Sequence, residues 1–276
     1  MEEKVQALSS PETDRAFHFQ TIEFKNVCFR YPGTHKYILK NCSFLLSADK
    51  AYALVGENGS GKSTIIKLLT GLYSEYEGTI KINGKSIKEY SYAELKSLIS
   101  VAFQDYSKYD LSLWKNIQLG NLKQYDIKRI QKVLDDVGLL SFCNNLKHGL
   151  YTELGKLEQE NIDLSEGQWQ RIEIARLLYA NREINILDEP TAALDPVAEA
   201  QIYELFRQIR KNRFVIYITH RLGSAKTADE ILVLKDGHIA EQGSHEELMS
   251  HPKGLYQTMY NIQKQLNQRN GEQVAT

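Results

Sequence analysis

The sequence predicts an α/β fold in which helices cover a mostly parallel sheet, and three patterns support this. Short apolar runs at residues 51–55, 184–187 and 214–218 are typical of buried parallel strands. Segments with apolar residues at helical spacing separate these runs, and strand–helix–strand alternation implies parallel pairing. Between about residues 110 and 180 strand signals almost disappear, which predicts a mostly helical insertion.

The amino-terminal elements can be assigned in chain order. Residues 1–19 are polar and predict a linker or arm. Alternation over residues 21–27 predicts a strand, and residues 44–46 belong to a second one. The buried run that ends at residue 55 leads into a glycine-rich segment and then into a helix at residues 64–70. Turn dipeptides flank a further strand at residues 79–82.

The remaining elements follow the same periodicities. We expect a helical subdomain at about residues 105–180, a helix at residues 197–209 and a strand at residues 231–234. Residues 20–265 then form one domain, which is long enough to bury a substantial core. The polar residues 266–276 predict a disordered tail.

Composition argues against several classes of protein. The 34 Lys and Arg are balanced by 35 Asp and Glu, so we expect no nucleic-acid partner. The cysteines, Cys28, Cys42 and Cys143, lack metal-binding spacing and predict buried residues in a reducing compartment. The charged amino terminus is not a signal peptide, and no apolar stretch reaches the roughly 18 residues that span a bilayer. We therefore expect a chain that is cytosolic by itself and reaches a membrane only through a partner.

Residues 56–63, here called the phosphate loop, fit the pattern GxxxxGK[ST] at every required position. Glycines let successive backbone N–H groups point at one anion, and the following helix directs its positive dipole end there. Lys62 supplies a charge for the β and γ phosphates, and the Ser63 hydroxyl is a Mg²⁺ ligand. The residues expected to bind nucleotide in this segment are Gly56, Glu57, Asn58, Gly59, Ser60, Gly61, Lys62, Ser63 and Thr64.

Two carboxylates, Asp188 and Glu189, follow the apolar run at residues 184–187. A carboxylate at the carboxyl end of a parallel strand, beside the phosphate loop, can hold Mg²⁺. We expect Asp188 to do so and Glu189 to polarise an attacking water. The sequence therefore predicts a P-loop nucleoside triphosphatase.

Residues 164–168, Leu-Ser-Glu-Gly-Gln, resemble the signature sequence of ATP-binding-cassette (ABC) ATPases. This segment, here called the signature turn, precedes a helix and lies ahead of the two carboxylates. Further marks of the family follow in order from about residue 21 to residue 260. They are Tyr31 as the aromatic that stacks on adenine, Gln104 between the subdomains, Asp195 in the D-loop (residues 193–195) and His220 as the switch histidine.

The resemblance implies a P-loop NTPase core with an amino-terminal antiparallel β subdomain and an inserted α-helical subdomain. It also implies an ATPase that uses ATP and Mg²⁺, with Lys62, Gln104, Glu189 and His220 as catalytic residues and Ser63, Gln104 and Asp188 as metal ligands. Two cassettes of this family pack head to tail as a homodimer. Ser165, Gly167 and Gln168 would then serve the ATP bound by the partner, because a Ser-x-Gly turn that opens a helix offers a hydroxyl and backbone N–H groups to a γ-phosphate.

Several segments are similar to the exporter branch of the family. They are the arm before residue 21 together with residues 24–32, residues 152–155, and the ending at residues 243–248 and 254–256. Residues 167–171 and 194–196 resemble bacterial exporters of lantibiotics and related peptides. The resemblance implies a transmembrane domain as partner, fused or separate, and a location at the cytoplasmic face of the cell membrane.

Two alternatives stay open on the residues alone. A soluble ABC ATPase acting on ribosomes or DNA would need a second cassette, a coiled-coil insertion or a basic surface. A nucleotide kinase or GTPase would lack the signature turn and His220, and a GTPase would carry Asn-Lys-x-Asp, which is absent from the sequence. Turnover of ATP against GTP tests the second alternative, and pull-down with membrane or ribosomal fractions tests the first.

The signature turn departs from the family consensus at Glu166, where the consensus has glycine. A carboxylate near phosphates would repel them if it pointed inward, so we expect Glu166 to face away or toward solvent. Glu166→Gly should therefore change the ATPase rate only modestly, as measured by phosphate release. A gain of about a hundredfold, equivalent to roughly 2.7 kcal/mol of barrier, would show instead that Glu166 damages the signature.

Overall fold

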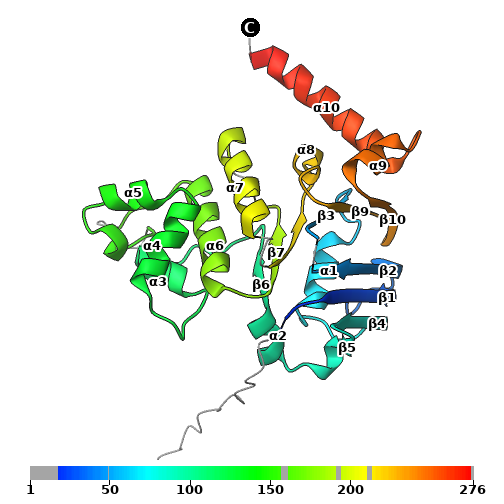
Figure 1. Cartoon of the computed structure of the whole chain (residues 1–276), viewed down its shortest axis with the longest axis horizontal. Helices are drawn as coiled ribbons and strands as arrows, with labels where there is room; N and C mark the ends of the chain where they lie inside the picture. Colours follow the sequence, from blue (N-terminus) through cyan, green and yellow to red (C-terminus); the bar gives the residue numbers. More distant parts are fainter. Residues whose placement is uncertain (1–17, 49, 157–160, 191–193, 210–212, 275–276) are drawn as a thin grey trace, which may run out of the picture.

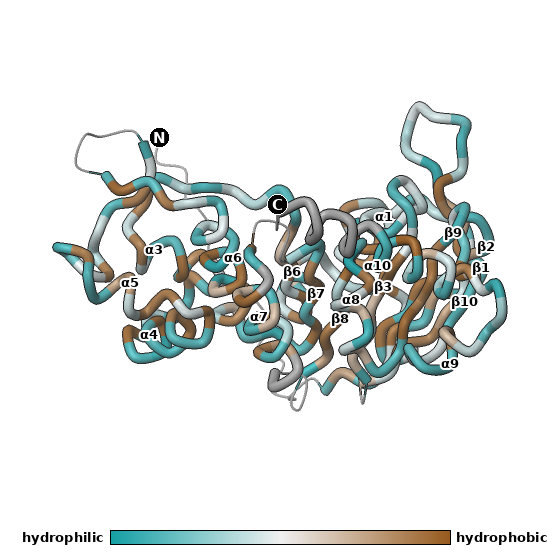
Figure 2. Tube along the Cα trace, turned by 90° about the horizontal axis from the view of Figure 1, so that it is seen from above, coloured by the Kyte–Doolittle hydropathy of each residue, from teal (hydrophilic) through white to brown (hydrophobic). Residues whose placement is uncertain are grey.

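The computed structural model describes residues 18–48, 50–156, 161–190, 194–209 and 213–274. The strands in these ranges form one four-stranded and one six-stranded sheet. Figures 1 and 2 show an elongated molecule with the helices α3, α4 and α5 at one end and the strands β1 and β2 at the other. The last helix, α10, runs outward from the body, with the carboxyl terminus at its far end (Figure 1).

The four-stranded sheet is antiparallel and has the order β2-β1-β4-β5. Its strands are β1 (Thr21–Phe29), β2 (Leu39–Ser47), β4 (Glu77–Ile82) and β5 (Lys85–Ser86). The alternation of β1 turns Ile22 and Phe24 inward, and both side chains are buried. The predicted antiparallel β subdomain at the amino-terminal end is confirmed.

The six-stranded sheet has the order β10-β9-β3-β8-β7-β6 and is parallel except for the β9–β10 hairpin. Its strands are β3 (Tyr52–Gly56), β6 (Ile99–Ala102), β7 (Ile184–Asp188), β8 (Phe214–Ile218), β9 (Glu230–Lys235) and β10 (His238–Gly243). Every residue of β3, β7 and β8 is buried, as the continuous apolar runs predict for a sheet covered on both faces. The predicted α/β class is therefore confirmed.

The helices divide into those that accompany the sheet and those of the insertion. The first group comprises α1 (Lys62–Leu69), α2 (Tyr92–Leu98), α7 (Pro196–Ile209), α8 (Leu222–Ala225), α9 (His245–Ser250) and α10 (Leu255–Val274). The insertion contains α3 (Leu113–Gln118), α4 (Ile127–Asp136), α5 (Leu140–Asn145) and α6 (Glu166–Ala180). Short 3₁₀ turns lie at Ile87–Glu89 and Gly149–Tyr151. The boundaries of the helical subdomain stay a prediction.

The buried apolar residues form two clusters on opposite faces of the six-stranded sheet. One lies between the sheets, where Phe24 stacks on Phe44 with ring centroids 4.4 Å apart. The Tyr52 hydroxyl joins the two sheets there, because it accepts a 3.0 Å hydrogen bond from the backbone N–H of Ser47. The other cluster joins the sheet to the helical insertion around Trp169. These two cores fix the insertion and the antiparallel sheet to the same central strands.

The last helix, α10, extends through residues 266–274. The disordered tail expected at residues 266–276 stays a prediction. Propagation of a helix from a packed first turn costs far less than nucleation, so the first turn of α10 decides where the helix lies. That first turn is anchored, because Tyr256 is fully buried and Glu241 accepts hydrogen bonds from the N–H groups of Leu255 (2.6 Å) and Tyr256 (2.9 Å). Residues 1–17 of the expected arm lie outside the described residues.

Gly56 ends β3 at φ 154°, and a Cβ there would lie 2.3 Å from the carbonyl oxygen of Leu234 in β9. We expect Gly56→Ala to lower the free energy of unfolding by about 1–3 kcal/mol, because the backbone of β9 cannot yield without breaking strand pairing. Urea denaturation measures this change. Gly223→Ala is the matched control, since a Cβ there meets no atom within 4 Å, and it should be neutral or slightly stabilising. Equal effects of the two substitutions would contradict the steric explanation.

Candidate functional site

The carboxyl ends of the parallel strands meet at one edge of the six-stranded sheet. β3 continues into the phosphate loop, β6 leads to Gln104, β7 ends at Asp188 and is followed by Glu189, and β8 leads to His220. A cavity of about 630 Å³ opens at this edge. The predicted residues that line it are Tyr31, Asn58, Gly59, Gly61, Lys62, Ser63, Thr64, Gln104, Asp188, Glu189 and His220.

Backbone carbonyls of the phosphate loop bind the loop's own lysine, Lys62. The Lys62 ammonium donates hydrogen bonds to the carbonyl oxygens of Gly56 (2.9 Å) and Glu57 (3.0 Å). Burial lowers the pKa of Lys62, and the nearby charges of Glu189 and Asp188 oppose this. The buried Ser60 hydroxyl finds no hydrogen-bond partner in the described part of the chain. A buried cation and an unpaired hydroxyl in a glycine-rich loop fit an anionic ligand.

Gly61 sets the start of the helix behind the loop. It is the N-cap of α1 at φ 112°, where a Cβ would lie 2.8 Å from Cδ2 of Leu39. The first turn of α1 contains no acidic residue. The positive end of the helix dipole therefore faces the cavity without a competing carboxylate in that turn.

Tyr31 lines the same cavity and is held from several directions. Its hydroxyl lies 3.0 Å from the Thr64 hydroxyl, and its ring makes edge contacts with Phe29 and Tyr73 at centroid distances of 5.1 and 5.4 Å. The Lys67 ammonium lies 5.4 Å from the ring centroid. The ring is thus fixed in place at the mouth of the cavity, where a planar base could stack on it.

The oxygen donors of Ser63, Gln104 and Asp188 line the same cavity. Burial raises the pKa of Asp188, and a hydrogen bond with the Ser63 side chain partly offsets the effect. Hydroxyl, amide and carboxylate oxygens are the hard ligands that Mg²⁺ prefers, and Mg²⁺ is commonly bound through one or two carboxylates together with phosphates. These residues therefore fit a magnesium ion.

Glu189 is held in an unusual conformation by three neighbours. Its φ of 50° is left-handed, and its N–H donates to the Ile218 carbonyl at 2.9 Å. Its own carbonyl accepts a 3.2 Å hydrogen bond from the Gln170 side chain, and its carboxylate lies 3.0 Å from Nδ1 of His220. Left-handed backbone at a non-glycine residue costs of order 1–3 kcal/mol and is concentrated at functional sites. The strain directs a largely buried carboxylate toward the cavity.

The signature turn does not line this cavity. Ser165 is the N-cap of α6 and forms a reciprocal capping box with Gln168, with N–H···O distances of 2.9 and 3.3 Å. Asp195 caps α7 by accepting from the N–H groups of Val197 and Ala198 at 3.0 Å, which holds the pKa of Asp195 below its usual range. Predicted residues absent from the cavity lining are Gly56, Glu57, Ser60, Ser165, Gly167, Gln168 and Asp195. Ala193 of the expected D-loop lies outside the described residues.

Two residues that the sequence did not single out support the site from a distance. Gln170 of α6 holds the Glu189 backbone. Gln263 of α10 donates to the His220 carbonyl at 2.8 Å and accepts from the Leu222 N–H at 2.6 Å. An isolated glutamine in a helix carries no sequence signal for such a contact, because the contact depends on how distant segments pack.

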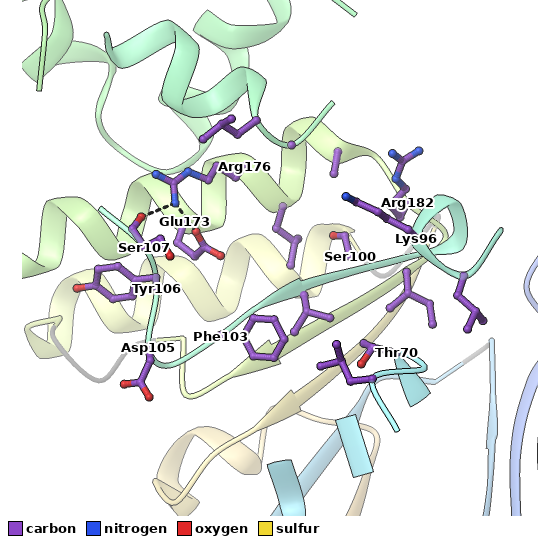
Figure 3. A pocket seen from close by; sticks show the side chains of 18 of the residues that line it. Thr70, Lys96, Ser100, Phe103, Asp105, Tyr106, Ser107, Glu173, Arg176 and Arg182 are labelled. Carbon is purple, nitrogen blue, oxygen red and sulfur yellow. Dashed lines mark hydrogen bonds and ion pairs between the residues drawn. The ribbon is translucent and has the colours of Figure 1, made fainter. Parts of the chain in front are cut away.

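A second cavity, of about 410 Å³, lies between the β6 side of the sheet and the helical insertion (Figure 3). Arg176 of α6 crosses it and donates to the Ser107 carbonyl at 2.9 Å and to Glu173 at 2.7 Å. Its lining includes the exposed apolar side chains Leu72, Tyr92, Phe103 and Tyr109. This hollow therefore combines exposed apolar side chains with charged ones.

In the described parts of the chain, none of the helices combines the length and the apolar character needed to cross a membrane.

Comparisons with known proteins agree with this geometry. A family model described as "ABC transporter" matches residues 39–192, more than half of the chain. The nisin transport ATP-binding protein of Lactococcus lactis subsp. lactis is 40% identical over 247 residues, which cover 88% of this chain and 40% of that protein. The subtilin transport ATP-binding protein of Bacillus subtilis is 40% identical over 249 residues, covering 90% and 40%. The ATP-dependent lipid A-core flippase of Escherichia coli (strain K12) is 38% identical over 242 residues, covering 88% and 41%.

A solved structure supports the same assignment. It is described as a bacterial Atm1-family ABC exporter with ATP bound, and it matches with a TM-score of 0.83 and 34% identity over 89% of this chain and 42% of that chain. The chain thus spans about 40% of the length of the curated relatives it matches. Fold, cavity and relatives lead to one conclusion: the chain belongs to the ABC transporter family and carries the ATPase domain of that family.

Proposed function

We propose that this chain binds and hydrolyses ATP as part of an ABC exporter, and that ATP-driven dimerisation powers transport of a peptide such as a lantibiotic. The observation that carries the proposal is the cavity in which Lys62, Asp188, Glu189 and His220 converge. The names of the nisin and subtilin relatives support the peptide cargo. Charge balance and these relatives favour export over an ABC ATPase that acts on ribosomes or DNA.

The phosphate loop holds the triphosphate. Its backbone N–H groups, the Lys62 ammonium and the α1 dipole neutralise the β and γ phosphates, and Tyr31 stacks on adenine. Ser63, Gln104 and Asp188 would hold Mg²⁺, which would neutralise charge on the phosphate oxygens. Lys62 then exchanges its present contacts with the Gly56 and Glu57 carbonyls for phosphate oxygens.

Glu189 orients the attacking water and accepts its proton. The water oxygen bonds to the γ-phosphorus as the bond to the bridging β–γ oxygen breaks, which releases ADP and inorganic phosphate. His220 lies against the Glu189 carboxylate and fixes its direction. This arrangement places a base beside the nucleophile, in a cavity whose charge Lys62 partly balances.

The signature turn serves the ATP of a second copy of the chain. Ser165 is exposed and Gln168 is half-buried, and α6 presents its positive end there. Neither residue lines the chain's own cavity, and the capping box uses their side-chain oxygens only as acceptors, so the Ser165 hydroxyl and the Gln168 side-chain amide can donate to a head-to-tail partner. Each ATP would then be enclosed by two chains, and hydrolysis would require the dimer.

The second cavity suits the membrane domain of the exporter. Exposed Leu72, Tyr92, Phe103 and Tyr109 gather around it, and apolar hollows of this kind commonly receive a partner's side chains. Ser107, whose carbonyl Arg176 holds, belongs to the segment that follows Gln104, so the hollow is linked to the nucleotide site.

The chain would work at the cytoplasmic face of the cell membrane. Six transmembrane helices encoded directly upstream would show that the membrane domain is fused.

Glu189→Gln should keep ATP binding and reduce turnover by about 10²–10⁴-fold, because it removes the base but not the phosphate contacts. Phosphate release measures turnover, a fluorescent ATP analogue measures binding, and size exclusion with ATP detects a long-lived dimer. Turnover at the wild-type rate in this variant would refute the role of Glu189.

A mixing experiment tests the head-to-tail arrangement. Lys62→Ala and Ser165→Arg should each be inactive alone, because one loses its own phosphate contact and the other blocks the partner's site. An equimolar mixture should recover partial ATPase activity, since each mixed dimer contains one intact pair of phosphate loop and signature turn. A mixture as inactive as its components would mean that the signature turn does not act across a dimer.

A further inference from the structure

The Glu166 carboxylate, which the sequence predicts to face away from the phosphates or toward solvent, is bound by two residues of the segment that follows Gln104. The Tyr106 hydroxyl donates to the Glu166 carboxylate (3.0 Å) and to its backbone carbonyl (2.9 Å). The Lys108 ammonium forms an ion pair with the other carboxylate oxygen. These contacts join segments about sixty residues apart in sequence. Glu166 therefore does not extend freely into solvent.

The contacts settle the charge state of the groups involved. Hydrogen bonds from Lys108 and Tyr106 hold the pKa of Glu166 below its usual range, so the carboxylate is ionised at neutral pH. Burial and the hydrogen bond to Glu166 raise the pKa of Tyr106, which remains a donor. A second carboxylate beside the turn, Asp163, is paired with Lys156 at 3.1 Å. Each of these two acidic groups thus has a lysine partner.

The segment after Gln104 is attached to α6 at a second place. Arg176 donates to the Ser107 carbonyl at 2.9 Å, and its guanidinium lies 5.0 Å from the ring centroid of Tyr109. Glu166 and Arg176 are ten residues apart, or about 15 Å along a helix that rises 1.5 Å per residue. Two well-separated attachments fix the direction of α6 relative to this segment as well as its distance from it.

We propose that Lys108 and Tyr106 are positioning residues for the signature turn: by holding and neutralising the Glu166 carboxylate, they let an acidic residue stand beside the partner's ATP. This inference rests on the proposed head-to-tail dimer. Without Lys108, the negative charge of Glu166 is uncompensated next to the partner's γ-phosphate and opposes closure. Without the carboxylate, Lys108 has no charge to compensate there.

The test uses ATP-dependent dimer formation in the Glu189→Gln background, measured by analytical ultracentrifugation. Adding Lys108→Gln should weaken the dimer by about fivefold at low salt, the scale of an exposed ion pair, because Lys108 and Glu166 have side chains that are 41% and 65% exposed. Raising the salt concentration should shrink the difference by screening. Glu166→Gln together with Lys108→Gln should restore the dimer. A loss of packing alone would neither respond to salt nor be rescued in this way.

The matched control is Lys132→Gln, which removes an exposed lysine from another ion pair of the helical insertion, with Asp136, and should leave the dimer unchanged. If Lys108→Gln behaves like this control, or if the double substitution fails to restore the dimer, the positioning role is wrong while the dimer stands. If the Glu189→Gln reference forms no dimer with ATP, the proposed function fails and the positioning role fails with it.

Discussion

The parallel pairing of β3 with β8 on one side and β9 on the other is the constraint on which the rest of the structure depends. Tyr52 and Leu54 of β3 pair with Ile216 and Ile218 of β8, so the carboxyl ends of both strands lie at the same edge of the sheet, with β3 extending two residues further. Parallel strands that end together release their following loops at one edge, and those loops contain the phosphate loop and His220. The close approach of Gly56 to β9 is part of the same pairing, since a side chain there would force the strands apart.

This constraint explains why charge can accumulate in a cavity walled by apolar strands. The charges of Glu189 and Asp188 partly offset the effect of burial on the pKa of Lys62, and Lys62 does the same for Asp188, whereas the Glu189 charge adds to the effect of burial on Asp188. A buried ion pair is weak evidence for stability, because desolvation commonly cancels the attraction. The left-handed backbone of Glu189 also costs free energy of folding. The buried charges and this strained backbone are therefore better explained by ligand binding and chemistry than by a contribution to stability.

The parts of the fold predicted from sequence are those whose signal is contiguous. Long buried runs such as β3, β7 and β8 and the phosphate loop were recognisable because each needs only neighbouring residues. β6 and β10 were not predicted. The four residues of β6 are too few for a pattern to emerge, and β10 consists largely of half-exposed or exposed residues at a sheet edge. The disordered tail at residues 266–276 stays a prediction, because polarity indicates solvent exposure but not backbone conformation.

The candidate site likewise contains residues with a contiguous sequence signal and residues without one. The phosphate loop and the two carboxylates follow from residue chemistry, while Tyr31, Gln104 and His220 needed the resemblance to a family. The contacts of Gln170 with Glu189 and of Lys108 with Glu166 join residues 19 and 58 positions apart, and only the folded chain brings them together. Sequence spacing does not encode such contacts, because packing of the insertion against the sheet decides them.

Gln263 links the last helix, α10, to the loop that carries His220, and the sequence alone does not reveal this contact. Its side-chain amide bridges the backbone on both sides of Arg221, so the loop that bears His220 is braced by α10. The buried Tyr256 and the hydrogen bonds to Glu241 fix the start of α10, and this holds Gln263 in position. Helix α10 thus supports the edge of the sheet at which the cavity opens. Shortening the protein before residue 263 would free that loop without touching a single residue of the cavity lining.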